Sequence, residues 1–156
     1  MRIEPGGLDA DDVVTLLREH LADMHATSPP ESVHALPLDG LRGQAVTFVT
    51  ARADDGALLG CGALKRIGPD AVELKAMRTA TAARGRGVGS AVLRHLLDVA
   101  RTLGCSTVCL ETGSMEYFAA ARRLYARHGF VETGPFGGYG PDPLSTFMVL
   151  RLRDRQ

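Results

Sequence analysis

The sequence has no excess of charge of either sign. Lysine and arginine together number 18, and so do aspartate and glutamate, so the formal net charge at pH 7 is zero. Proteins that bind duplex nucleic acid through its phosphates usually carry a clear positive excess. The balance argues against nucleic acid as a partner, although it leaves room for a local basic patch.

Long apolar runs and a paired cysteine pattern are also missing. No apolar run approaches the roughly 20 residues that a helix needs to span a bilayer. No signal-peptide pattern is present at the start either, so we expect a cytoplasmic protein without a membrane partner. The three cysteines are an odd number without CxxC spacing. Their apolar, strand-like surroundings predict buried thiols, and we expect neither a disulfide nor a bound metal.

What the sequence does contain is a glycine-rich stretch near its centre. Residues 84–90 read Arg-Gly-Arg-Gly-Val-Gly-Ser. Apolar residues then recur at steps of three and four as far as Leu103, the spacing of one buried helix face, and Gly104 is a stop signal. A glycine loop before a helix leaves unpaired N–H groups at the positive end of the helix dipole. The stretch therefore predicts an anion site, most simply for phosphate.

The remaining periodicities predict a mixed α/β fold in a single domain over residues 1–156, with no repeat or linker that divides it. The segment 32–41 is left open as a short helix or an ordered loop, because Pro37 interrupts it. Gly60 and Gly62, inside a predicted strand, indicate a bulge or close packing. We predict strands over 2–4, 45–51, 57–67, 71–79, 107–111, 130–133 and 145–152, and helices over 10–25, 91–103 and 117–128.

Two nucleotide-binding motifs fail on spacing. A triphosphatase loop needs GxxxxGK[ST], and no lysine follows these glycines. A dinucleotide loop needs GxGxxG near the start of a β–α–β repeat, whereas these glycines lie at alternate positions after an antiparallel meander. A plain glycine turn is less favoured than an anion site, because Arg84 and Arg86 would be poor neighbours for a helix N-terminus without an anion.

A third pattern fits. Arg84-x-x-Gly87-x-Gly89 resembles the (Gln/Arg)-x-x-Gly-x-(Gly/Ala) acyl-CoA signature of the GNAT superfamily of N-acetyltransferases. Residues 121–130, Ala-Arg-Arg-Leu-Tyr-Ala-Arg-His-Gly-Phe, are similar to its second motif, A-x-x-L-Y-x-x-x-G-F. The matching order covers about 45–152, and the loops resemble those of small bacterial members. The resemblance implies the GNAT fold, a mixed and mostly antiparallel sheet that splays between its fourth and fifth strands and is flanked by helices.

The same resemblance implies acetyl-CoA (coenzyme A) as the cosubstrate. Backbone N–H groups of the glycine loop would hold its pyrophosphate, and the end of the fourth strand would pair with its pantetheine arm. The two arginine side chains would either add charge to the phosphates or remain solvated. The matching cofactor positions are Met77, Thr79, Arg84, Gly85, Arg86, Gly87, Val88, Gly89 and Ser90.

The reaction implied is direct acetyl transfer to a primary amine. An amine with a lysine-like pKa is mostly protonated at pH 7, and its neutral form costs roughly 4–5 kcal/mol. Glu73 stands where some relatives keep a catalytic glutamate, but it could instead pair with Lys75 or Arg78. Glu111 is the rival base or a binder of a cationic substrate. Tyr125 matches the tyrosine that donates a proton to the departing thiolate, and its alternative is an ordinary packing role.

One position departs from the family pattern, and the acceptor site is the least defined. Phe118 replaces an asparagine of many relatives, so that residue's contact to the pantetheine arm or a nearby loop is missing or replaced.

The acceptor is expected between segments 28–36 and 134–143. A cationic amine would suit carboxylates there, and a carboxylated amine would suit arginine or histidine. The candidate acceptor contacts are Glu31, His34, Phe136 and Tyr139.

We therefore expect an N-acetyltransferase for a small-molecule amine. A protein lysine or N-terminal acetyltransferase is the second hypothesis, disfavoured by the neutral charge and the loop-walled pocket. A non-catalytic acyl-CoA-binding module would keep the glycines but would not need Tyr125, Glu73 and Glu111 together. A homodimer is compatible with the resemblance, although no residue points to one.

Overall fold

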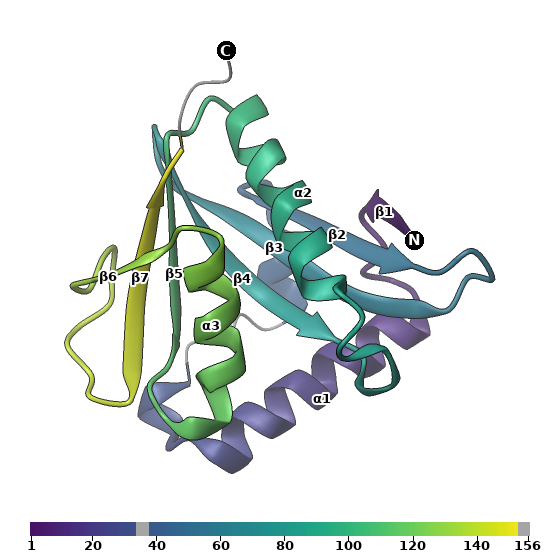
Figure 1. Ribbon diagram of the computed structural model, residues 1–156, viewed down its shortest axis with the longest axis horizontal. Coiled ribbons are helices and arrows are strands. Elements are labelled where there is room, and N and C mark those ends of the chain that lie inside the picture. Colours follow the sequence, from purple (N-terminus) through teal and green to yellow (C-terminus); the bar gives the residue numbers. More distant parts are fainter. Residues whose placement is uncertain (34–37, 153–156) are drawn as a thin grey trace.

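The computed structural model describes residues 1–33 and 38–152, and in them a twisted mixed sheet runs through the molecule (Figure 1). The strand order is β1-β2-β3-β4-β5-β7-β6, and only the β4–β5 pair is parallel. The strands are β1 (Arg2–Pro5), β2 (Val46–Arg52), β3 (Leu58–Gly68), β4 (Ala71–Thr79), β5 (Thr107–Gly113), β6 (Val131–Thr133) and β7 (Ser145–Arg151). The predicted α/β class and the order of strands are confirmed, with ends shifted by a few residues.

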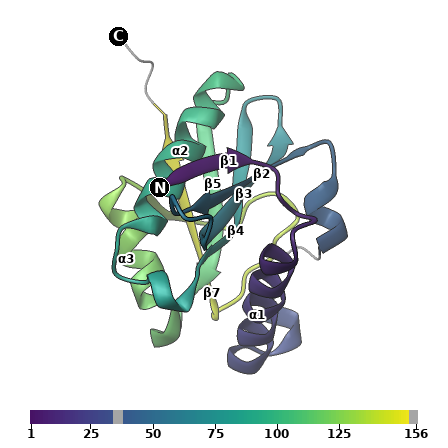
Figure 2. The ribbon, with the colours of Figure 1, turned by 90° about the vertical axis from the view of Figure 1, so that its right-hand side faces the viewer.

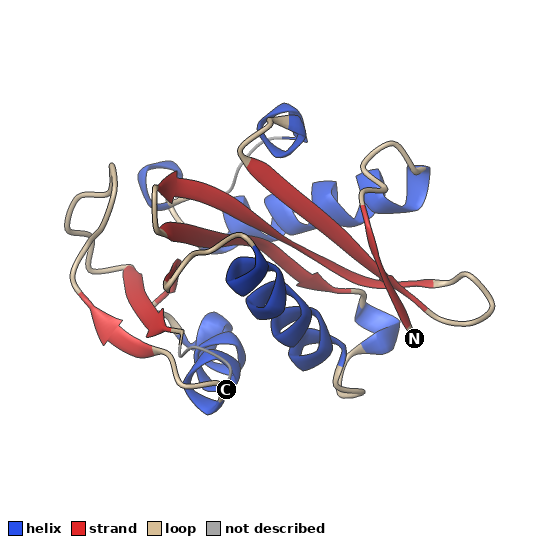
Figure 3. Cartoon of the chain, turned by 90° about the horizontal axis from the view of Figure 1, so that it is seen from above, coloured by secondary structure: helices blue, strands red, loops and turns tan. Residues whose placement is uncertain are grey.

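Helices cover both faces of the sheet. Helix α1 (Asp11–Thr27) lies on one face, and α2 (Val88–Thr102) and α3 (Ala119–Arg127) lie on the other (Figure 2, Figure 3). On either side of residues 34–37, the segment left open in the sequence begins and ends in short 3-10 turns, Pro30–Ser32 and Leu38–Arg42. None of the described helices is both long and apolar enough to cross a bilayer.

The core follows the periodic patterns of the sequence. The apolar stripe of α2 is buried against the sheet, as its three- and four-residue spacing predicts. A smaller cluster fixes α1 through Val13, Leu16 and Leu17. The three cysteines are buried free thiols, as predicted.

The feature that positions the site is the parting of β4 from β5. Their pairing runs from Ala71 opposite Thr107 to Leu74 opposite Leu110 and then stops. Beyond this point β4 continues along β3, whereas β5 continues along β7. Ala76 has a positive φ of 56°, and the β3–β4 register shifts beside it, so the strand bulges where the splay begins. The predicted splay is therefore present, and the bulge turns β4 away from β5.

Gly62 on β3 lies beneath this bulge and allows α2 to approach the sheet closely. A Cβ atom at Gly62 would lie 2.6 Å from Met77 Sδ and 2.9 Å from methyl carbons of Val92 and Leu96. Contacts this short do not occur in packed cores, so a side chain here would displace both α2 and the bulged strand. The close packing predicted at this glycine is confirmed.

We expect Gly62→Ala to lower the free energy of unfolding by about 1–3 kcal/mol, the usual range for overpacking. Gly68→Ala is the matched control on the same strand, because a Cβ there meets nothing within 4 Å. It should change stability by less than about 0.5 kcal/mol. Urea unfolding of both variants measures the difference, and equal stabilities would contradict the packing role of Gly62.

Candidate active site

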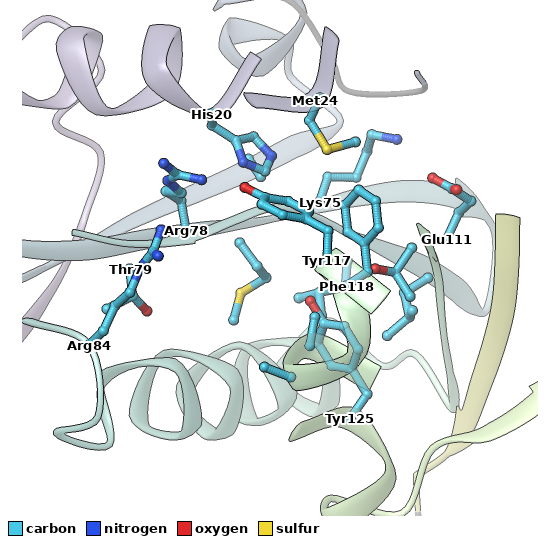
Figure 4. Close-up of a pocket in the computed structure, with 17 residues that line it drawn as sticks. His20, Met24, Lys75, Arg78, Thr79, Arg84, Glu111, Tyr117, Phe118 and Tyr125 are labelled. Carbon is cyan, nitrogen blue, oxygen red and sulfur yellow. The ribbon is translucent and has the colours of Figure 1, made fainter. Parts of the chain in front are cut away.

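A cleft opens where β4 and β5 part (Figure 4). Its volume is about 310 Å³. Residues 74–79 of β4 and 110–112 of β5 form its walls. Helix α1 closes one side with His20 and Met24, and α3 closes another with Tyr125. The sheet thus supplies backbone along the length of the cleft, and helices from both faces supply side chains.

The glycine loop lies at one end of this cleft. Gly85 and Gly87 have φ values of 78° and 79°, a left-handed conformation that favours glycine, and Gly87 is the residue that precedes α2. No side chain caps α2, so its first N–H groups remain available to an anion. Gly89 has another reason for being small, because a Cβ there would lie 3.2 Å from Leu124 of α3. The loop has the conformation and the free donors that the predicted phosphate site requires.

The predicted cofactor side chains divide into two groups. Met77, Thr79 and Arg84 line the cleft. Arg86 instead donates from Nη2 to the carbonyl oxygen of Ala82, at 2.8 Å, and so binds the backbone of its own loop. Arg84 is therefore the loop arginine whose side chain faces the cleft.

Tyr125 is buried on α3, with only 7% of its surface exposed. Figure 4 shows its hydroxyl directed towards the cleft. The ring packs edge-on against Phe130, with centroids 5.8 Å apart. Burial raises the pKa of Tyr125, and the negative charge of Glu111 raises it further. The hydroxyl therefore keeps its proton at neutral pH, as a proton donor must.

The two candidate carboxylates occupy different environments. Glu73 is buried and accepts a hydrogen bond of 3.1 Å from Lys75 Nζ and one of 2.5 Å from the Tyr139 hydroxyl. The described cleft lining includes Lys75 but not Glu73. Glu111 does line the cleft, and its charge reaches the hydroxyls of both Tyr125 and Tyr139. The ion pair foreseen as the alternative for Glu73 is therefore formed with Lys75.

Tyr139 joins the loop 134–143 to the sheet. Besides donating to Glu73, its hydroxyl accepts a hydrogen bond of 3.0 Å from Lys75. Its ring packs with Phe136 and Phe147, with centroid separations of 5.2 and 5.5 Å. Burial raises the pKa of Tyr139, and its hydrogen bond to Glu73 acts in the same direction. Tyr139 is one of the predicted acceptor contacts, and its hydrogen bonds to β4 and its packing on Phe147 fix this loop residue against the sheet.

The two segments predicted to enclose the acceptor do meet. Ser32 Oγ donates to Asp142 Oδ2 at 2.6 Å and so joins the end of the N-terminal segment to the last loop. Glu31 is exposed, and the described cleft lining contains neither Glu31 nor Phe136. His34 lies outside the described residues. The walls are adjacent as predicted, but the side chains of Glu31 and Phe136 are not part of the cleft lining.

Phe118 stands where many relatives have an asparagine, and its side chain packs on the neighbouring chain instead of forming hydrogen bonds. Its ring covers Gly113, where a Cβ atom would lie 2.0 Å from the ring. The loop that follows β5 at Gly113 receives its polar contacts from Arg122, whose Nη1 donates to the carbonyl oxygens of Gly113 and Met115 at 2.7 and 2.9 Å. Arg122 therefore holds the loop at the end of β5, where Phe118 offers no polar group.

A charged cluster at the α1 side of the cleft was not predicted. Arg78 of β4 donates from Nη2 to Asp23 Oδ2 of α1 at 2.6 Å. The Tyr117 hydroxyl donates to the same oxygen at 3.4 Å. His20, one turn before Asp23 on α1, completes the wall. His20 and Asp23 share one face of α1, but no sequence spacing joins them to Arg78 or Tyr117, which the fold brings in from distant positions.

His20 is kept neutral by this environment. Its pKa is lowered to about 4, mainly by burial, with the positive charge of Arg78 adding to the effect and Asp23 opposing it. The imidazole therefore contributes a neutral polar group to the cleft at pH 7.

The similarities of the chain agree with this geometry. The model of the acetyltransferase (GNAT) family matches residues 13–130. The N-acetyltransferase YsnE of Bacillus subtilis is 45% identical over 152 residues, which cover 97% of this chain and 100% of that protein. The IAA acetyltransferase of Azospirillum brasilense is 41% identical over 142 residues, 88% of this chain and 89% of that protein.

The solved structures show the same fold. An acyl-CoA N-acyltransferase from Klebsiella pneumoniae superposes with a TM-score of 0.80 at 29% identity and covers 97% of each chain. Rv2747 from Mycobacterium tuberculosis, solved in complex with CoA and NLQ, has a TM-score of 0.69 at 22% identity, over 98% of this chain and 100% of that one.

Burial of neutral His20 makes stability depend on pH. The pKa in the folded state is about 4, below the ordinary 6.5, so the unfolded chain binds the proton more readily. The contribution of neutral His20 to the free energy of unfolding is fully present above pH 6.5 and is lost as the pH falls towards 4. Relative to His20→Gln, the wild type should lose up to about 3 kcal/mol of unfolding free energy across this range. Urea unfolding between pH 7 and 4 tests this, and parallel curves for the two proteins would contradict it.

Proposed function

Because the chain belongs to the GNAT family of acetyltransferases, we propose that it transfers the acetyl group of acetyl-CoA directly to the primary amine of a small molecule. The observation that carries this proposal is the cleft in the splay, which joins the glycine-loop end of β4 to Tyr125 and Glu111. One groove thus presents an anion site, an open strand edge and two groups able to handle protons.

The described residues fit the donor. Residues 85–90 offer the uncapped helix start to the pyrophosphate. Beyond Leu74, β4 has no pairing with β5, so its backbone near Met77 and Thr79 is free to pair with the pantetheine arm in the manner of a strand. When bound, acetyl-CoA supplies an activated acetyl group as a thioester.

Glu111 and Tyr125 divide the proton transfers between them. Glu111 accepts, directly or through water, the proton that the acceptor ammonium must lose before its nitrogen attacks the acetyl carbon. Tyr125 donates its phenolic proton to the sulfur as the carbon–sulfur bond breaks, and burial keeps that proton in place until then. The nitrogen, now bonded to the acetyl carbon, gives its second proton to the Tyr125 phenolate, directly or through water, and Glu111 releases its proton to solvent. Glu73 takes a supporting role, because its carboxylate is engaged by Lys75 and Tyr139.

A small acceptor is favoured by the enclosure of the cleft. Helix α1 and the 3-10 turn Glu116–Phe118 bound it on the acceptor side, so the acceptor enters a walled space and not an open surface. The name of the Azospirillum relative, IAA acetyltransferase, likewise points to a small-molecule acceptor.

Release of free CoA thiol across a panel of amines tests the function, with acetyl-CoA binding measured by calorimetry alongside. We expect tight binding of acetyl-CoA and thiol release that depends on a small amine. Tight binding without amine-dependent release would make the chain a binding module, and release only with folded protein acceptors would contradict the small-molecule proposal.

Tyr125→Phe should lower kcat by about 10²-fold or more, because it removes the acid that serves the thiolate. The ring and its packing on Phe130 are kept, so the dissociation constant of acetyl-CoA should change little. Steady-state kinetics with calorimetry measures both quantities. Unchanged turnover from pH 6 to 9 would remove Tyr125 from the mechanism.

Matched substitutions separate the two carboxylates. Glu111→Gln should lower kcat/KM by about 10²–10⁴-fold while stability is kept. Glu73→Gln should instead cost about 3 kcal/mol of stability, because Lys75 loses its buried counter-charge. The folded fraction of that variant should keep kcat within about tenfold of the wild type, since its amide still contacts Tyr139. The reverse pattern would make Glu73 the base.

A further inference from the structure

We propose that the acceptor amine also carries a carboxylate and that Arg78 binds it. This inference rests on the proposed acetyl transfer and names the chemical class of its acceptor. It is carried by the position of Arg78 in the cleft, by its spare hydrogen-bond donors and by the charge at the opposite end.

Arg78 is a buried cation in the wall of the cleft. Its side chain is only 10% exposed, yet the residue is part of the lining. A guanidinium has five N–H donors in a planar fork. Nη2 donates to Asp23 and the guanidinium also contacts the Tyr117 hydroxyl, while Nε is buried and has no hydrogen-bond partner in the part of the chain that the structure describes. A planar anion with two oxygens is the ligand that such a fork matches best.

The counter-charge of Arg78 is one that a ligand can displace. Asp23 is 44% exposed, so its carboxylate can turn into water at little cost, whereas the burial of Arg78 fixes the guanidinium. The positive charge of Arg84, which lines the same cleft, also reaches Asp23. Two arginines thus face one half-exposed carboxylate at this end, which leaves the local field positive.

Arg78 is not oriented towards the expected phosphate site. Its ion pair with Asp23 places the guanidinium on the face of the sheet covered by α1. The glycine loop begins α2, which covers the opposite face. The anion that Arg78 attracts therefore approaches from the acceptor side of the cleft.

The two ends of the cleft carry opposite charges at a spacing that an amino acid can bridge. Glu111 follows Leu110, the last β5 residue paired with β4, whereas Arg78 lies four residues beyond its partner Leu74. Because the two strands are parallel, Arg78 and Glu111 differ by three residues, which is roughly 10 Å along the strand at about 3.3 Å per residue, and the two long side chains shorten this distance. Figure 4 shows Arg78 and Glu111 at opposite ends of the cleft. An ammonium at Glu111 and a carboxylate at Arg78 describe an amino acid or another amino carboxylate.

The test uses pairs of acceptors that differ only in the carboxylate. Amino acids with the amine in the α, β or γ position are compared with their carboxamides, and kcat/KM is measured by thiol release. The wild type should prefer at least one carboxylate over its amide by about tenfold or more. Arg78→Gln should bring that ratio close to one while the KM for acetyl-CoA stays within about twofold.

Asp23→Asn is the matched control, because it removes the competing carboxylate and keeps Arg78. It should lower the KM of the carboxylated acceptor by several-fold, opposite to the effect of Arg78→Gln. If Arg78 only ties α1 to the sheet, both variants should instead lower kcat/KM equally for the carboxylate and the carboxamide. Thermal unfolding followed by circular dichroism should then show that both variants are less stable.

Four outcomes would overturn the inference. The wild type could prefer the amides throughout, or Arg78→Gln could leave the carboxylate preference intact, and in both cases amine acetylation would still stand. A change only in the KM for acetyl-CoA would assign Arg78 to the donor instead. Absence of thiol release with every acceptor would overturn the proposed function and this inference with it.

Discussion

The loss of hydrogen bonding between β4 and β5 after Leu74 and Leu110 is the constraint on which the rest of the structure depends. A parallel pair that stops within a sheet leaves backbone groups that need another partner. The bulge at Ala76 turns β4 away from β5. Cys61 stabilises this bulge by donating from Sγ to the Ala76 carbonyl oxygen at 3.3 Å. Gly62 lets α2 close on the same bulge from the opposite face. The cleft is therefore built into the backbone and does not depend on the side chains that line it.

The two faces of the sheet offer different groups to the cleft. The α2 face ends in a glycine loop with free donors and a positive helix end, and the α1 face carries ionised side chains in opposite pairs. Lys75 and Arg78 come from the same strand, but Lys75 has a buried partner in Glu73 and Arg78 has a half-exposed one in Asp23. Both partners of the Lys75 pair are buried, so that pair is costly to break, whereas the carboxylate that pairs with Arg78 can turn towards water.

The sequence predicted the parts of the molecule that depend on local chemistry. The helix after the glycine loop, the strand ending at Thr79 and the stop at Gly104 follow from periodicity and from the backbone freedom of glycine. The cluster of Arg78 with Asp23 was out of reach, because the two residues are 55 positions apart and meet only when α1 crosses the end of β4. Tyr139 was predicted near the acceptor, yet its hydroxyl binds Glu73 and Lys75, which lie 66 and 64 positions away, and no local pattern records these contacts.

The central claim is that the splay holds the donor along β4, and a crystal structure of the chain with bound CoA tests it most directly. The account predicts the pyrophosphate on the backbone N–H groups of residues 85–90, hydrogen bonds between the pantetheine arm and β4 at Met77 and Thr79, and the sulfur beside the Tyr125 hydroxyl. CoA bound outside the splay, or with its sulfur remote from Tyr125, would contradict the account.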